Sequence, residues 1–485
     1  MNRKVASSLF WRYLERCGAQ GVNLVVSIIL ARLLLPDDYG LVALVSVFIT
    51  ILNVFVNSGL GNALIQKKDA DDLDFSSVFW FNIVWCIILY LLLFLCAPLI
   101  AGFYKKPDLT LVLRVLGLQI IISGVKNIQQ AYVSRTMQFR KFFFATLGGT
   151  IGAAIIGIWM AYHGYGVWAL VVQQLFNAAV DTIILWIIVK WRPHRQFSFV
   201  RLKGLYSYGW KLLVSALLDT IYGEIRQLII GKKYTSADLA FYNKGNNIPN
   251  MIITNIDTSI NSVLFPTMSQ EQDDRERVRG MIRRAIKTST YIIAPLMMGL
   301  VFISEPLIRL LLTEKWLPSV PYMRIFCITY MFYPIHTANL NAIQALGRSD
   351  IFLKLEILKK IVGITAVLIT MNISVMAMGY SLLVTCVICQ MINAWPNRKL
   401  LGYRYLEQLR DIMPGILLAV FMGGCVYCVS FLKLPDAVTL VIQIILGAGI
   451  YYFGSRLLKM ESYEYITSMI RQWRREKKGT VDPDQ

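Results

Sequence analysis

Three charged residues stand near the middle of an apolar run that is long enough to cross a membrane. The run Leu205–Ile230 contains the stretch LLDTIYGEIRQLII, which carries Asp219, Glu224 and Arg226. Each Asp or Arg at the centre of a membrane helix costs roughly 2.5–3.5 kcal/mol, whereas each Leu or Ile returns only about 0.3–0.6 kcal/mol. The three groups must therefore face protein or a water-filled cavity, where they can bind a charged ligand or carry an ion.

Most polar side chains of this run fall on one stripe of the predicted helix. At intervals of three or four residues the stripe contains Lys211, Ser215, Asp219, Tyr222 and Arg226. Asp219 and Arg226 lie about two turns apart, roughly 10 Å along the axis, so they are too far apart to neutralise each other. Glu224 lies off the stripe, and an ion pair with Arg226 that only fixes helix packing is the alternative for it.

The composition indicates a bilayer protein. Hydrophobic residues make up 56% of the 485 and charged residues 16%, with a mean hydropathy of +0.55, whereas soluble domains carry about 25% charged residues. We count fourteen apolar runs between Leu9 and Leu458, each near the length of about 20 residues that a membrane helix needs. The first run has no small-residue cleavage site after it, which favours a retained helix. The sequence therefore predicts an all-α polytopic membrane protein with about 14 transmembrane helices.

The net charge of +20 reflects membrane orientation rather than nucleic-acid binding. Basic residues gather in alternate connections and in the tail after Lys459, while the remaining connections hold few. This asymmetry is what the positive-inside rule predicts for an even number of spans with both termini in the cytoplasm. Lys105 and Lys315 should then lie outside, and Arg195 and Arg398 inside.

No motif for a metal, a cofactor or catalysis stands out. Two C-x-x-C pairs, Cys386–Cys389 and Cys425–Cys428, lie inside apolar spans, where cysteines pack well between helices. Zinc is the alternative for that spacing. The chain has no phosphate-binding loop, and its longest outside connection, Gly231–Asn247, has no paired carboxylates for acid–base work. We expect no cofactor, no bound metal and no enzymatic activity.

A weak repeat at an offset of 200 residues divides the chain. Ala63-Leu64-Ile65 stands against Val263-Leu264-Phe265, and Asn57 against Asp257. An even number of helices in each copy gives two parallel six-helix bundles, whose interface commonly holds a transporter's substrate site. The predicted parts are an N-terminal lobe (1–196), a C-terminal lobe (197–395), helices thirteen and fourteen (396–458), and a cytoplasmic tail (459–485).

Four ordered motifs resemble a known family of exporters. They are ARLLLPDDYGLVAL (Ala31–Leu44), SGLGNALIQKKD (Ser58–Asp69), LFPTMSQEQDD (Leu264–Asp274) and QALGRSDIF (Gln344–Phe352). Together they are similar to the polysaccharide-exporter branch of the multidrug/oligosaccharidyl-lipid/polysaccharide (MOP) superfamily, and within it to the Wzx-type flippases of colanic-acid-exporter kind. One difference is Leu312–Trp316 (LTEKW), where related chains tend to carry Phe-Gly-x-x-Trp and this chain lacks the glycine.

The resemblance implies a V-shaped fold that moves undecaprenyl-diphosphate-linked oligosaccharide from the inner to the outer leaflet by alternating access. It implies the bacterial cytoplasmic membrane as the location, and lipid-linked oligosaccharide, membrane lipids and a polysaccharide polymerase with its chain-length machinery as partners. The helices lining the family's cleft add further candidates to the stripe. These cavity candidates are Arg12, Arg16, Asn23, Asn57, Asp257 and Asn261.

Two questions stay open from the sequence. Arg12 and Arg16 can instead anchor a helix end at the membrane surface by snorkelling. Asp219, Glu224 and Asp257 can instead couple transport to protons or sodium. The rival function is a multidrug or organic-cation exporter of the same superfamily, which would want anionic cavity walls. The stretch Gln272–Lys287 reads as an amphipathic helix, either a solvated connector or a reader of lipid headgroups.

Overall fold

The structure, a computed structural model, describes residues 3–57, 60–67, 69–432 and 434–479. Within these ranges the side chains of 3–10, 12, 13, 62, 66, 207, 208, 211, 470 and 473–479 lie outside the described part. The predicted site residues Arg12 and Lys211 are among them. Every regular element in the described part is a helix, which confirms the all-α class.

Membrane-crossing helices dominate the chain. In the described ranges, 10 helical segments are long and apolar enough to span a bilayer. Four further predicted spans form helices that are more polar than this, namely α9, α10, the α12–α13 pair and α14. The count of fourteen therefore stays a prediction, and two of the four more polar segments carry predicted site residues.

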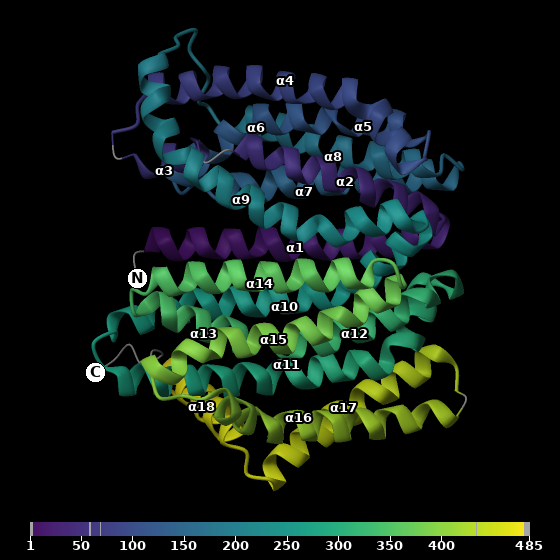
Figure 1. Cartoon of the computed structure of the whole chain (residues 1–485), viewed down its shortest axis with the longest axis vertical. Helices are drawn as coiled ribbons and strands as arrows, with labels where there is room; N and C mark the ends of the chain where they lie inside the picture. The colour runs from purple at the N-terminus through teal and green to yellow at the C-terminus, as the bar shows by residue number, and fades with distance from the viewer. Residues whose placement is uncertain (1–2, 58–59, 68, 433, 480–485) are drawn as a thin grey trace. The chain divides into compact units, whose positions relative to one another are not determined.

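The chain divides into two compact units after Ala240. The helices of the first unit are α1 (Arg3–Leu33), α2 (Pro36–Asn57), α3 (Leu60–Gln66), α4 (Asp72–Tyr104), α5 (Leu109–Leu116), α6 (Leu118–Arg135), α7 (Arg140–Tyr162), α8 (Val167–Ile188) and α9 (Phe199–Lys233), followed by the first turn of α10 (Figure 1). Here α7 packs along α8, and α1 along α7, while α9 packs against α2, α3 and α4. These contacts group α9 with the first unit, whereas the lobe boundary predicted from the sequence lies just before it and stays a prediction.

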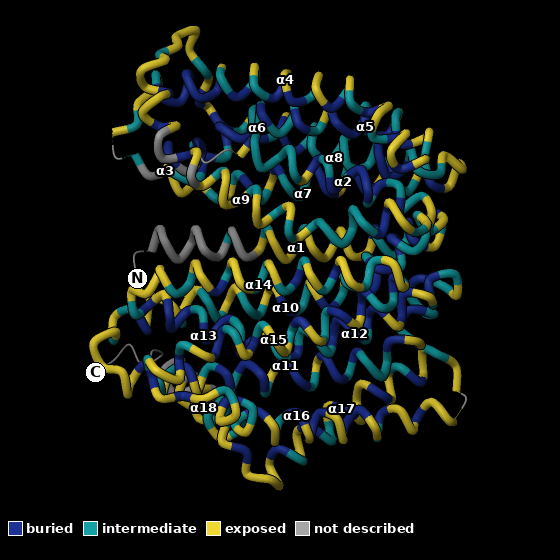
Figure 2. The backbone as a smooth tube through the Cα atoms, viewed as in Figure 1, coloured by how far each residue is buried: buried dark blue, intermediate teal, exposed yellow. Residues whose placement is uncertain are grey.

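Helix α4 illustrates how sequence signals set a membrane helix. It begins at a capping box in which Asp71 accepts from the backbone N–H of Asp74 and Asp74 accepts from that of Asp71, so both orphan donors are satisfied. Phe75, Val78, Phe79 and further apolar residues of one face are buried against the unit, while the opposite face is exposed (Figure 2). An exposed apolar face suits contact with lipid tails rather than with water.

Three spans predicted as single helices each cover two α-helices in the described chain, and one of them, Leu41–Ile65, covers α2 and α3. Leu109–Val133 breaks at Gly117, where a Cβ would lie 2.9 Å from Cδ2 of Leu93 and 2.7 Å from the carbonyl oxygen of Leu113. A larger residue would clash there, so the break between α5 and α6 needs glycine. The second break, at Phe332, is followed by Pro334, which has no N–H to continue the helical ladder.

The second unit is built around α11. Its elements are α10 (Ser236–Gln270), α11 (Arg275–Leu312), η1 (Glu314–Ser319), α12 (Val320–Met331), α13 (Tyr333–Ala345), α14 (Ser349–Thr370), α15 (Val375–Leu400), α16 (Tyr405–Cys428), η2 (Val429–Leu432), α17 (Asp436–Leu457) and α18 (Glu461–Gly479). Helix α11 packs against α12, α13, α16 and α17. The predicted amphipathic segment is the start of α11, where Val278, Ile282 and Ile286 are fully buried, so its apolar face contacts protein.

In the turn after α11, a threonine adopts a backbone conformation that is typical of glycine. Thr313 has φ 81° and ψ 171°, a backbone region that is essentially reserved for glycine. It stands where related chains have Gly in the Phe-Gly-x-x-Trp motif. Trp316 of the same motif is fully buried, and threonine occupies a backbone conformation that glycine adopts without strain.

Candidate functional site

The stripe on α9 is partly buried in the first unit. Asp219 is exposed, while Tyr222, Glu224 and Arg226 are half-buried. Nε and Nη2 of Arg226 are buried and have no hydrogen-bond partner in the described part of the chain. Glu224 accepts from Nε2 of Gln227 at 2.5 Å, and the Glu224–Arg226 pair weighed as an alternative does not form. A guanidinium with donors left over is suited to a planar anion.

The candidates on α1 and α2 lie at the surface of the first unit. Arg16, Asn23 and Asn57 are exposed. No hydrogen bond or ion pair ties Arg16 or Asn23 to another described residue, whereas Glu15, beside Arg16, accepts from Oγ1 of Thr146 on α7 at 3.3 Å. Helix α1 is therefore attached to α7 through Glu15. Arg16 and Asn23 remain available to bind a ligand.

The α10 candidates belong to a closed hydrogen-bond network. Asp257 accepts from Oγ1 of Thr337 at 2.5 Å and from Nδ2 of Asn261 at 2.9 Å. Asn261 in turn accepts from Nδ2 of Asn341. The structure thus brings Asp257 and Asn261 together, as expected, and joins them to α13. Thr337 on α13 and Asn261 on α10 itself stabilise the charge of Asp257 without a ligand.

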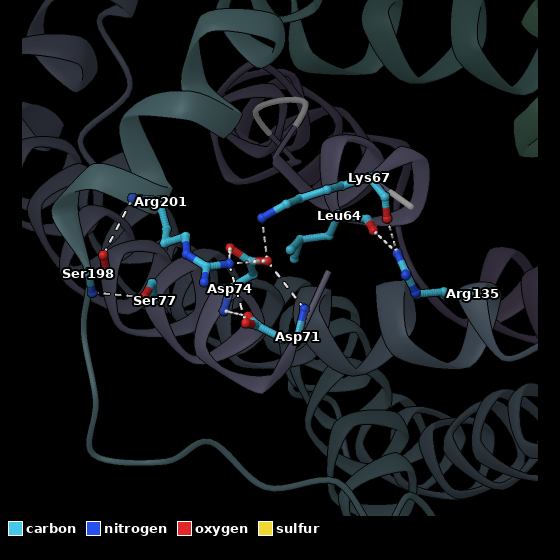
Figure 3. Close-up of polar contacts among 8 residues, drawn as sticks. All are labelled: Leu64, Lys67, Asp71, Asp74, Ser77, Arg135, Ser198 and Arg201. Carbon is cyan, nitrogen blue, oxygen red and sulfur yellow. Dashed lines mark hydrogen bonds and ion pairs between the residues drawn. The ribbon is translucent and has the colours of Figure 1, made fainter. Parts of the chain in front are cut away.

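A cluster of charges holds the first end of α9 on α4 (Figure 3). The carboxylate of Asp74 is fully buried and accepts from Nζ of Lys67 at 2.5 Å, and Nη1 of Arg201 lies 3.4 Å from it. The same Arg201 nitrogen lies 3.3 Å from Asp71. The backbone N–H of Asp74, more than the nearby Arg201, holds the pKa of Asp71 below its usual value. Two carboxylates and two cations thus neutralise one another at this helix end.

Neighbouring bonds extend this attachment. The backbone N–H of Ser198, the N-cap of α9, donates to Oγ of Ser77 at 2.9 Å, and Nη1 of Arg135 donates to the carbonyl oxygens of Leu64 and Lys67 at 2.6 Å each (Figure 3). An apolar cluster that includes Leu202 and Phe75 lies beside them. The last end of α9 is also held, because Tyr104 donates to the carbonyl oxygen of Leu228 at 3.5 Å.

One ionised pair within the spans was not predicted. Lys126 of α6 and Asp181 of α8 form a salt bridge with side-chain exposures of 23% and 11%. Asp181 is the one charge of the run Val167–Val189, and Lys126 shares the run Leu109–Val133 with Arg114. A charge within an apolar span was the signal available in the sequence. The partners are 55 residues apart, so only the packing of α6 on α8 identifies them as a pair.

The described part has no group of three or more His, Cys, Asp or Glu residues placed to hold a metal ion. All eight cysteines are free. In the first unit, the exposed Arg16 and the two buried nitrogens of Arg226 without a described partner favour an anionic ligand.

Comparison with known sequences gives one family and several relatives. The model of the polysaccharide biosynthesis protein family matches residues 29–321, more than half of the chain. The chain is 26% identical over 331 residues to the succinoglycan biosynthesis transport protein ExoT of Rhizobium meliloti (strain 1021), covering 67% of this chain and 66% of that protein. It is 23% identical over 410 residues to the teichuronic acid biosynthesis protein TuaB of Bacillus subtilis (strain 168), covering 82% and 84%. It is also 22% identical over 371 residues to the lipopolysaccharide biosynthesis protein WzxC of Escherichia coli (strain K12), covering 76% and 75%.

Two solved structures share the fold. The lipid II flippase MurJ in an inward closed conformation aligns with a TM-score of 0.77 and 14% identity, covering 93% of this chain and 99% of that one. An inward-facing multidrug resistance MATE transporter aligns with a TM-score of 0.62 and 15% identity, covering 79% and 94%. The chain therefore belongs to the polysaccharide biosynthesis protein family and has the fold of the MOP superfamily of membrane transporters.

Proposed function

We propose that this protein is a flippase for surface-polysaccharide biosynthesis. It moves undecaprenyl-diphosphate-linked oligosaccharide from the inner to the outer leaflet of the bacterial cytoplasmic membrane by alternating access. Family membership and the names of the relatives support a role in polysaccharide export. The names differ in their glycans, so the repeat unit itself is left open.

The observation that carries the proposal is the half-buried Arg226. Two of its guanidinium nitrogens are buried without a protein partner, and a buried charged donor left unsatisfied is costly. A diphosphate supplies several anionic oxygens, and a planar guanidinium can bind two of them at once. Arg16, exposed on α1, is a second cation of the same kind, and Asn23 and Tyr222 offer partners for sugar hydroxyls.

The rival is an organic-cation exporter, which the MATE-like fold allows. Such a protein needs a carboxylate that is free to meet its substrate. Asp257 is the natural candidate on α10, but it already accepts from Thr337 and Asn261. The buried guanidinium nitrogens of Arg226 that have no partner in the described chain are instead basic, which favours the anionic substrate.

Substitution of Arg226 tests the proposal. Arg226→Ala should accumulate in the membrane at the wild-type level and reduce glycan export by about tenfold or more, since a hydrogen bond to a charged group contributes about 1.5–3 kcal/mol. Arg226→Lys should restore only part of the rate because an ammonium lacks the two-point geometry. Accumulation and export are measured together, with Arg398→Ala as the matched control. Wild-type export by Arg226→Ala, or loss of the protein itself, would refute this role.

Orientation and driving force belong to the same proposal. With both termini cytoplasmic, single cysteines at Lys105 and Lys315 should react from outside, and those at Arg195 and Arg398 only from inside. Moving about two negative charges outward across 100 mV is favourable by about 4–5 kcal/mol, so the membrane potential should contribute. Reconstituted flipping that continues unchanged when the potential is collapsed at constant ion gradients would instead favour ion coupling through Asp219, Glu224 or Asp257.

A further inference from the structure

Two adjacent cavities lie in the second unit where α11, α16 and α18 begin. The first, about 770 Å³, is mainly apolar and includes Leu417, Phe421 and Leu457. The second, about 640 Å³, is mainly polar and includes Arg279, Arg283, Tyr403 and Arg410. Both are lined by Lys287, Asp411 and Pro414. The polar cavity is thus adjacent to the apolar one. This arrangement suits a lipid, which has a charged headgroup and an apolar acyl chain.

Some charged side chains where the two cavities meet have hydrogen-bond or ion-pair partners, and others have none among the described residues. Asp411 accepts from Nε and Nη2 of Arg283 at 2.8 and 2.9 Å and from the hydroxyl of Tyr403 at 2.7 Å. Lys287 lies 3.4 Å from Asp411 and 2.5 Å from Glu461. These contacts neutralise the carboxylate of Asp411, so it does not repel an anion placed beside it.

Two cations at the junction are left over. The side chains of Arg410, which lines the polar cavity, and Lys459, which lines the apolar one, make no hydrogen bond or ion pair with another described residue. Arg279 is only loosely paired, with 3.7 Å between its Nη2 and Oε2 of Glu407. Unpaired cations beside a neutralised carboxylate favour a phosphate over a cationic ligand.

The apolar hollow opens outward. Phe421 is 64% exposed and Leu457 83% exposed, which in a membrane places them against acyl chains. Helix α18 then packs on α11, and the guanidinium of Arg284 lies over the ring of Tyr465 at 5.2 Å. A helix with aromatic and basic residues that follows the last membrane span is suited to the bilayer surface.

We propose that these two cavities form a binding site for an anionic phospholipid, with its phosphate at Lys287, Arg410 and Lys459 and one acyl chain along Leu417, Phe421 and Leu457. Neither cavity includes a residue of α1, α9 or α10, the helices of the proposed substrate site. The bound lipid is therefore a partner distinct from the transported one. It lies in the inner leaflet if the termini are cytoplasmic as proposed.

Lipid titration of the purified full chain tests this site. Apparent affinities of dioleoyl phosphatidylglycerol, dioleoyl phosphatidylcholine and undecaprenyl phosphate are measured by native mass spectrometry. Phosphatidylglycerol should bind more tightly than phosphatidylcholine, which carries the same chains without net charge. The double variant Arg410→Ala/Lys459→Ala should lose this preference, with an affinity for phosphatidylglycerol weaker by about tenfold or more, whereas Arg398→Ala/Lys399→Ala, at another exposed basic turn, should keep it.

Thermal unfolding without added lipid shows that both double variants are folded. Equal binding of the two phospholipids, or full retention by Arg410→Ala/Lys459→Ala, would overturn the proposal. So would tighter binding of undecaprenyl phosphate that the same double variant abolishes, because the site would then belong to the polyprenyl substrate. Glycan export lost in Arg226→Ala but phosphatidylglycerol binding unchanged would separate the two sites.

Discussion

Arg226 and Asp257 are both charged residues of polar membrane helices, yet their surroundings differ. The carboxylate of Asp257 accepts two side-chain hydrogen bonds, from Thr337 and Asn261. The guanidinium of Arg226 keeps two buried nitrogens without a described partner. A charge with hydrogen-bond partners contributes to the stability of the folded state, whereas a charge without them is available to a ligand. Lys126 and Asp181 are also charges with a protein partner, because they form an ion pair with each other.

The largest effect should come from breaking the ion pair. Asp181→Ala leaves the Lys126 ammonium within apolar spans, and loss of one partner of a buried pair costs about 3–5 kcal/mol. We expect poor accumulation in the membrane and a much lower midpoint of thermal unfolding in detergent. The double variant Lys126→Met/Asp181→Leu should recover most of that stability, because no unpaired charge remains. Equal instability of the single and double variants would mean that the pair is not the cause.

A smaller loss should follow at Asp257. Asp257→Ala orphans the donors of Thr337 and Asn261, which costs about 1–3 kcal/mol. Asp257→Asn retains an acceptor oxygen and should lose less. Both are compared by thermal unfolding, with Asn255→Ala, an exposed residue of the same helix, as the control. If Asp257→Asn unfolds at the wild-type temperature but abolishes export, the carboxylate has a transport role that its hydrogen bonds do not explain.

The smallest effect on stability should be at Arg226. Arg226→Met keeps the length of the side chain and removes donors that have no protein partner, so the free energy of unfolding should change by about 0.5 kcal/mol or less. Export should nevertheless fall as it does for Arg226→Ala. A stability loss as large as that of Asp257→Ala would remove the distinction between the two residues.

The sequence predicted the helices well because membrane spans need long apolar runs. Asp257 and Asn261 are four residues apart and therefore neighbours on one helix, but the hydrogen bond between them was not predicted from the sequence. The break at Gly117 depends on the close approach of Leu93, and the break at Phe332 is followed by Pro334; a hydropathy pattern registers neither. The motif around Thr313 was informative in a different way, because the missing glycine marked the residue whose φ is 81°.

Site residues were harder to predict than helices. Asp219 and Arg226 stood out because several charges fall in one span. Lys126 and Asp181 lie in two separate spans, and only tertiary packing makes them a pair. The charge cluster at Asp74 also joins distant parts of the chain, since Arg201 follows it by 127 residues. Local spacing therefore identified charges that are grouped in one span more readily than charges that are paired across distant parts of the chain.

Helix α9 is attached to the rest of the first unit near both of its ends. Its N-terminal end is held by Asp74 and Ser77, and its C-terminal end by the contact of Tyr104 with Leu228. Between these supports Leu212, Val214 and Leu218 are exposed. Because both ends are attached, we expect Asp219 to move further than either terminus when the protein changes state. Distances from spin labels at residues 200, 219 and 233 to a common label on α4 measure that displacement and leave the attachment of Arg201 intact.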